Sequence, residues 1–293
     1  NLADSIADGD LDYIAAPETA VDHISLNKLD EEYMVQSIRK FVKDYEGLHF
    51  IIGIDATKKY KAGAEEVPPT ATKMTNSNRY YDIFNSAIQI DSTARIPVYH
   101  KSKLVTGVEK MPYPRFLKFL NNFILNIGGT TGNRGFQEER GVFYSLDSSF
   151  RVAPVICYES VFGEYVSEYI HKGANVIFII TNDGWLLSPG YKQHMHFARL
   201  RAIETRRSIA RSANTGISCF INQKGQVVKS TEWWAEDAIK STLHANNEKT
   251  FYVEHGDLIG RIASFLAVFA LLYMVAKMLM NRTKNKDLLR LRE

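Results

Sequence analysis

The stretch Val-Ala-Pro-Val-Ile-Cys-Tyr-Glu-Ser at residues 152–160 decides the fold class of this chain. Its apolar run ends at Cys157, apolar residues at helical spacing follow over residues 161–170, and a second apolar run covers residues 176–180. This order predicts a strand, a sharp turn, a helix and a parallel strand, which together form a crossover unit. Functional groups collect at the carboxyl ends of strands in such sheets, so we expect Cys157 at an edge where chemistry takes place.

Cys157 has two interpretations. On a turn that opens a helix, its thiol would be exposed and near the positive end of the helix dipole, and both conditions favour a nucleophilic thiolate. The alternative is a small buried apolar residue, as most free cysteines are. The second cysteine, Cys219, lies in an apolar run and is expected in the core. Two cysteines form neither a disulfide framework nor a metal cluster, and a nucleophile would have to stay reduced rather than pair with Cys219.

The rest of the chain continues the alternation of strands and helices. Apolar patterns predict strands at residues 11–15, 49–53, 80–90 and 96–100, helices at 30–46 and 193–212, and a hairpin at 217–229. We therefore expect an α/β fold with helices outside two packed sheets. With 293 residues, 45% of them hydrophobic and 24% charged, the chain can form one large domain or two small ones. A net charge of +3, without a basic stripe interleaved with aromatic residues, argues against nucleic-acid binding.

The C-terminal region has a different composition. Residues 258–280 are almost wholly apolar, with Arg261 and Lys277 near the two ends. A helix of this length spans roughly 35 Å, enough to cross the apolar core of a bilayer. Basic residues follow at positions 282, 284, 286, 290 and 292, which predicts a cytoplasmic C-terminus with the preceding domain outside. The alternative is a buried amphipathic helix that closes the domain, but the polar face that such a helix needs is missing.

Two charged residues also follow predicted strands. Glu18 comes after the strand at 11–15, and Lys101 comes after the strand at 96–100. Each alone could be a solvated surface charge. Together with Cys157 they provide a carboxylate, an ammonium group and a thiol that parallel strands could bring to one edge.

Histidine is the usual base for a cysteine nucleophile, and the chain has eight. None of them follows a predicted strand beside an obvious carboxylate, and His100 is the best placed. His194 and His196 are two positions apart on a predicted helix, so they face different directions and do not suggest a metal site.

Three short motifs resemble those of the nitrilase, or carbon-nitrogen hydrolase, superfamily: Pro17-Glu18, residues 99–105 (Tyr-His-Lys-Ser-Lys-Leu-Val) and residues 156–159 (Ile-Cys-Tyr-Glu). Within it, the chain is most similar to the apolipoprotein N-acyltransferase family. That similarity is carried by Asn-Asp-Gly-Trp at 182–185, Gln-His at 193–194, Asn-Thr-Gly at 214–216, and Arg199, Arg201, Ala202, Glu204 and Arg207.

The resemblance implies an α-β-β-α sandwich with a Glu-Lys-Cys triad. Glu18 would be the general base, Lys101 would stabilise the oxyanion and Cys157 would be the nucleophile. The supporting residues would be Glu109, Tyr158 and Glu159. Trp185, together with the apolar segment 116–127, would contact acyl chains. The resemblance implies no metal and no cofactor.

The implied reaction moves a fatty acyl chain from a phospholipid, typically phosphatidylethanolamine, through a cysteine thioester. The acceptor would be the N-terminal amine of a diacylglyceryl-cysteine apolipoprotein at the bacterial inner membrane. The resemblance then divides the chain into a periplasmic nitrilase-like catalytic domain at residues 1–256, a transmembrane helix at 257–280 and a basic cytoplasmic tail at 281–293. We further expect the family's membrane helices and first domain strand to precede residue 1.

The chain departs from the family pattern at several positions. Ala16 stands where the family often has tryptophan, Lys103 where it commonly has histidine, and Thr106-Gly107-Val108 where it has Pro-Phe-Gly. Two alternative functions are a nitrilase-type amidase that hydrolyses small amides and a catalytically dead, membrane-tethered binding module. A soluble amidase would not need the C-terminal span, and a dead module would not need all three triad residues.

Overall fold

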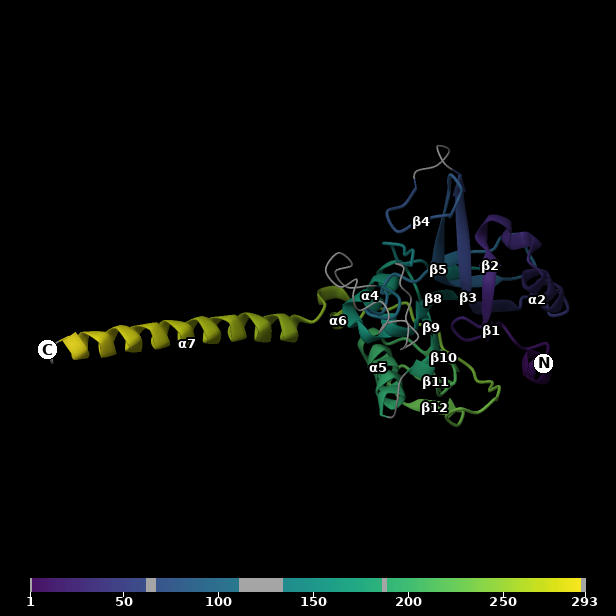
Figure 1. The fold of residues 1–293 in the computed structure, drawn as a ribbon. Helices are drawn as coiled ribbons and strands as arrows, with labels where there is room; N and C mark the ends of the chain where they lie inside the picture. Colours follow the sequence, from purple (N-terminus) through teal and green to yellow (C-terminus); the bar gives the residue numbers. More distant parts are fainter. Residues whose placement is uncertain (1, 62–66, 111–133, 186–188, 291–293) are drawn as a thin grey trace.

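Two six-stranded sheets pack face to face, with helices on their outer faces (Figure 1). This computed structural model describes residues 2–61, 67–110, 134–185 and 189–290. Between the sheets, the ring of Tyr13 meets the edge of Phe178, with 5.3 Å between ring centroids. The arrangement confirms the predicted α/β sandwich.

The first sheet is built around two long antiparallel strands, β3 (His49–Lys61) and β5 (Arg79–Ile90). The short strands β1 (Tyr13–Ala15) and β2 (Val21–Ser25) run parallel to β3. The remaining strands, β4 (Thr72–Lys73) and β6 (Val98–His100), pair with β5. Strands β5 and β6 match the strands predicted at residues 80–90 and 96–100, and they pair antiparallel.

Three helical segments accompany the first sheet: α1 (Leu2–Ile6), the 3-10 segment η1 (Leu26–Glu31) and α2 (Tyr33–Lys43). Helix α2 buries Val35 and Val42 against the sheet. It is shorter than the helix predicted at 30–46, because Asp30 lies within η1 and the helix starts only at Tyr33.

The second sheet has the order β12-β11-β10-β9-β8-β7. Its strands are β7 (Phe143–Tyr144), β8 (Arg151–Ile156), β9 (Val176–Asn182), β10 (Ile209–Asn214), β11 (Cys219–Ile221) and β12 (Val227–Ser230). Strands β8, β9 and β10 are parallel, so the predicted crossover unit is confirmed. It passes through η3 (Cys157–Val161) and α4 (Gly163–His171). Both β8 and β9 are covered on both faces, which explains their continuous apolar sequence.

The prediction of one helix over residues 193–212 is wrong. Helix α5 (Gly190–Thr205) ends at Arg206, whose backbone is left-handed with φ of 50°, and the chain then enters β10. Arg211 lies in β10 rather than on this helix. In the structure its guanidinium is buried because the Asp183 carboxylate, 2.6 Å away, neutralises it.

The C-terminal helix α7 (Leu258–Arg290) projects away from the sandwich (Figure 1). It follows the short helix α6 (Phe251–His255), and an ion pair of 2.6 Å between Arg261 and Glu164 joins its first turn to α4. By length and composition alone, its 24 residues Leu258–Asn281 could cross a membrane, and none of its most apolar part is buried against the domain. The alternative of a buried closing helix is therefore wrong.

Candidate active site

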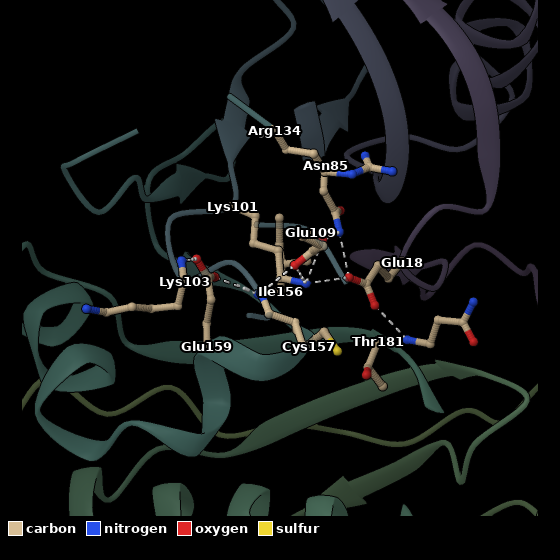
Figure 2. Close-up of polar contacts among 12 residues, drawn as sticks. Glu18, Asn85, Lys101, Lys103, Glu109, Arg134, Ile156, Cys157, Glu159 and Thr181 are labelled. Atoms are coloured by element: carbon tan, nitrogen blue, oxygen red, sulfur yellow. Dashed lines mark hydrogen bonds and ion pairs between the residues drawn. The ribbon is translucent and has the colours of Figure 1, made fainter. Parts of the chain in front are cut away.

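Glu18, Lys101 and Glu109 form a buried cluster at the carboxyl ends of strands β1 and β6 (Figure 2). The Lys101 ammonium nitrogen lies 2.9 Å from Glu18 Oε1 and 3.0 Å from Glu109 Oε2. Gly53 permits this placement, because a Cβ atom there would lie only 2.5 Å from the Glu18 Cα. One cation thus bridges two carboxylates.

The charges in this cluster stabilise one another. Burial alone would lower the pKa of Lys101, but the negative charges of Glu18, Cys157 as thiolate and Glu109 outweigh burial and raise it. Burial alone would raise the pKa of Glu109, but Lys101 and the Val105 backbone N–H lower it. Lys101 is therefore held as a cation although its side chain is 2% exposed.

Cys157 is the first residue after β8, and its sulfur lies beside Thr181 and the Glu18–Lys101 pair (Figure 2). Its backbone is left-handed, with φ of 50°. Cys157 opens the five-residue 3-10 segment η3, and the α-helix α4 begins only at Gly163. Burial and the charge of Glu18 raise the pKa of its thiol to about 12, although Lys101 and Thr181 oppose them. The expectation of an exposed, dipole-stabilised thiolate is therefore wrong: the resting group is a half-buried thiol.

Asn85 also belongs to this cluster, and sequence reasoning missed it. Its amide Nδ2 donates to Glu18 Oε1 at 2.7 Å and to Glu109 Oε1 at 2.9 Å. The backbone N–H of Asn182 donates to the other Glu18 oxygen at 2.8 Å. The available signal was an asparagine in the middle of the buried strand β5, where a polar side chain needs a partner.

Glu159 is fully buried directly behind the site. Its carboxylate accepts hydrogen bonds from the backbone N–H groups of Ser102 (2.7 Å) and Ile156 (2.9 Å) and from the Tyr99 hydroxyl (2.8 Å). It thereby ties the loop after Lys101 to the end of β8. Tyr158 instead packs at the surface, edge-on against Phe162 with 5.1 Å between ring centroids.

The other sequence candidates lie in different places. His100 hydrogen bonds to Ser86 at 2.7 Å, and burial lowers its pKa to about 4. Within the described ranges, no group of three or more His, Cys, Asp or Glu side chains could hold a metal ion. The backbone of Trp185 ends the short segment η4 (Asp183–Trp185), but its side chain and the apolar segment 116–127 lie outside the described residues.

The sequence of this chain matches a known protein family and several curated relatives. The carbon-nitrogen hydrolase family matches residues 2–249. The chain is 30% identical over 277 residues to the apolipoprotein N-acyltransferase of Chlorobaculum tepidum, covering 91% of this chain and 50% of that protein. It is 34% identical over 200 residues to that of Allorhizobium ampelinum, covering 68% of this chain and 36% of the relative. The chain thus spans half or less of the length of these curated relatives.

Solved structures share the fold at low sequence identity. A CN-hydrolase superfamily protein from Xanthomonas campestris superposes with a TM-score of 0.53 at 16% identity, covering 83% of this chain and 82% of the other. A nitrilase-superfamily member from Saccharomyces cerevisiae gives 0.51 at 14% identity, covering 78% and 74%. At these identities the likeness extends to the arrangement of sheets and helices alone.

Proposed function

Because this chain belongs to the carbon-nitrogen hydrolase family, we propose that Glu18, Lys101 and Cys157 are a catalytic triad of an apolipoprotein N-acyltransferase. The observation that carries the proposal is the meeting of a thiol, a carboxylate and a buried ammonium group beyond the ends of strands β8, β1 and β6 (Figure 2). The names of the curated relatives support the acyl-transfer assignment.

In the first step, Glu18 accepts the thiol proton as Cys157 attacks an ester carbonyl carbon of a phospholipid. The thiol needs this base because its pKa is raised to about 12. The Lys101 ammonium stabilises the negative oxygen of the tetrahedral intermediate, and one such donor contributes roughly 2.7–4 kcal/mol. The carbon–oxygen bond then breaks, Glu18 returns its proton to the departing alkoxide, and lysophospholipid leaves an acyl thioester on Cys157.

In the second step, the N-terminal amine of a diacylglyceryl-cysteine apolipoprotein attacks the thioester. Glu18 accepts a proton from the amine, the carbon–sulfur bond breaks, and the Cys157 thiolate is protonated again. The product is an amide, and the enzyme returns to its starting state. Because lysophospholipid leaves and the acyl chain stays on Cys157 before the amine reacts, ping-pong kinetics follow.

The C-terminal helix supports a lipid substrate over a small soluble one. We propose that residues 1–256 form the catalytic domain, 257–280 the membrane span and 281–293 a cytoplasmic tail. This arrangement would place the domain on the periplasmic side of a bacterial inner membrane, within reach of phosphatidylethanolamine and lipoprotein acceptors. Helix α7 follows α6, and its Arg261 pairs with Glu164 in α4. Because α4 comes directly after the Cys157 turn, α7 leaves the sandwich on the side that carries this turn.

Intact-mass measurement of the full membrane protein with phosphatidylethanolamine tests the proposal. We expect an added fatty-acyl mass that hydroxylamine removes, as for a thioester, and that Cys157→Ala abolishes. An adduct that survives Cys157→Ala would overturn the assignment of the nucleophile. No adduct, together with release of ammonia from small amides, would favour the amidase instead.

A further inference from the structure

A second group of buried ionisable side chains contacts the Cys157 turn from the second sheet. Asp183 Oδ1 lies 2.9 Å from His194 Nδ1, and Asp183 Oδ2 lies 2.6 Å from Arg211 Nη2. The side chains are at most 6% exposed. Burial would raise the pKa of Asp183, but the hydrogen bond from His194 and the charge of Arg211 lower it to about 2, so its carboxylate is ionised. The proposed reaction uses none of these three residues.

The other side of the His194 ring faces the residue that carries the thiol. His194 Nε2 lies 3.2 Å from the backbone carbonyl oxygen of Cys157 and 3.0 Å from Ser160 Oγ. The Ser160 hydroxyl donates to the same carbonyl at 2.7 Å. A carbonyl oxygen can only accept, so the contact is favourable when Nε2 carries a proton.

The backbone that this contact holds is strained. Cys157 has φ of 50°, a left-handed conformation that non-glycine residues adopt only when their surroundings impose it. The orientation of this peptide determines where the Cys157 side chain points, and therefore whether the sulfur faces Glu18 and Lys101. Hydrogen bonds from Ser160 and His194 to the Cys157 carbonyl can hold the backbone in this left-handed conformation.

We infer that His194 is a positioning residue: through its Nε2–H it holds the Cys157 carbonyl, so that the left-handed turn aims the sulfur at the Glu18–Lys101 pair. Asp183, itself fixed by Arg211 and by a 3.0 Å hydrogen bond from Thr181, orients the imidazole ring from its other nitrogen. The inference rests on the proposed role of Cys157 as the nucleophile.

Two substitutions distinguish the contact of His194 with the Cys157 carbonyl from its contact with Asp183. In His194→Gln, the side-chain amide can reach the position of Nε2 and donate to the Cys157 carbonyl. In His194→Asn, the shorter amide takes the position of Nδ1 and keeps only the contact with Asp183. His196, exposed on the same helix, provides matched controls in His196→Gln and His196→Asn.

Two rates should be measured on the full-length protein in detergent: alkylation of Cys157 by iodoacetamide, and single-turnover thioester formation from phosphatidylethanolamine micelles. Alkylation needs no acyl donor, so it reports on the turn even if the proposed acyl transfer is wrong. Cys157→Ala supplies the background from the buried Cys219.

We expect His194→Asn to lower both rates at least about tenfold, while His194→Gln stays within about threefold of the parent at a similar unfolding temperature. The His196 variants should match the parent. Equal rates in the two His194 variants, or faster reaction in the asparagine variant, would overturn the inference. Should either variant fail to fold, Ser160→Ala tests the same carbonyl: a drop in alkylation rate at unchanged unfolding temperature supports it, and an unchanged rate refutes it.

Discussion

The Lys101 ammonium nitrogen and Glu18 Oε1 lie 2.9 Å apart, although 83 positions separate the two residues in the chain. Both side chains are almost fully buried, at 2% and 6% exposure. Such a pair gains its stability from mutual compensation, because each charge alone would be costly away from water. The contact that we propose for the chemistry is therefore also a contact on which the fold depends.

Lys101→Met should destabilise the domain as well as abolish acyl transfer. It leaves Glu18 and Glu109 buried without their common cation, and breaking a buried pair in this way costs about 3–5 kcal/mol. Denaturant unfolding of the detergent-solubilised protein measures the loss. Lys103→Met is the matched control: its exposed ammonium lies over the rings of Phe162 and Tyr165, so a loss of no more than about 1 kcal/mol is expected. Equal losses in the two variants would contradict this account.

Glu18→Gln should slow thioester formation far more than Glu109→Gln. The two substitutions remove the same charge from the same lysine, but only Glu18 is assigned the transfer of protons, which typically contributes about 10²–10⁴-fold. Single-turnover acylation of the two variants provides the comparison. If both slow the reaction equally, Glu18 acts only through the charge of Lys101 and is not the base.

Cys157→Ala should remove the acyl adduct and leave the fold in place. Cys219→Ala should keep the adduct, because Cys219 lies buried in β11 among core residues rather than at the site. Intact-mass spectra of the two variants after incubation with phospholipid decide between the cysteines. An adduct that disappears in Cys219→Ala but persists in Cys157→Ala would reverse the assignment.

Stability should depend on pH through Glu204. Burial raises the pKa of this carboxyl to about 7 from an ordinary 4.5, although Arg201 opposes the shift. Because the folded-state pKa is the higher one, the stability that the protonated form provides is complete below pH 4.5 and is lost as the pH rises to 7. Glu204→Gln should therefore gain unfolding temperature relative to the parent between pH 5 and pH 8. Curves that stay parallel across this range would show that the carboxyl does not titrate there.

The orientation of the C-terminal helix can be tested separately from catalysis. Green fluorescent protein fused after Glu293 should fluoresce, because it folds to its fluorescent form in the cytoplasm, where the basic tail is expected. Alkaline phosphatase fused at the same position should be inactive, since it needs the oxidising periplasm. The opposite result would place the tail outside and reject the proposed topology.

The sequence predicted the parts of this fold in which local pattern and tertiary environment agree. Strands β8 and β9 are covered on both faces, so they appear as continuous apolar runs. Cys157 stands directly after β8, Lys101 follows β6, and Glu18 lies three residues beyond β1, so the predicted strands mark all three as residues near strand ends. Their meeting at one edge follows from the layered sheets.

The missed features depend on partners that are distant in the chain. Strand β10 contains Arg211, whose buried charge is neutralised by Asp183, 28 positions away. Asn85 joins the site because Glu18 and Glu109 approach it from two other segments. The pKa of Cys157 likewise depends on how deeply its turn is enclosed, which no local pattern records.

The left-handed backbone at Cys157 costs local stability, whereas its sulfur is needed for the proposed chemistry. Glycine adopts this conformation without steric cost, so a glycine at position 157 would relax the turn and leave it chemically inert. Substitutions selected for stability alone would therefore replace Cys157 and remove its sulfur. The chain retains there a residue that its own backbone geometry disfavours, a pattern typical of positions selected for reactivity rather than for folding.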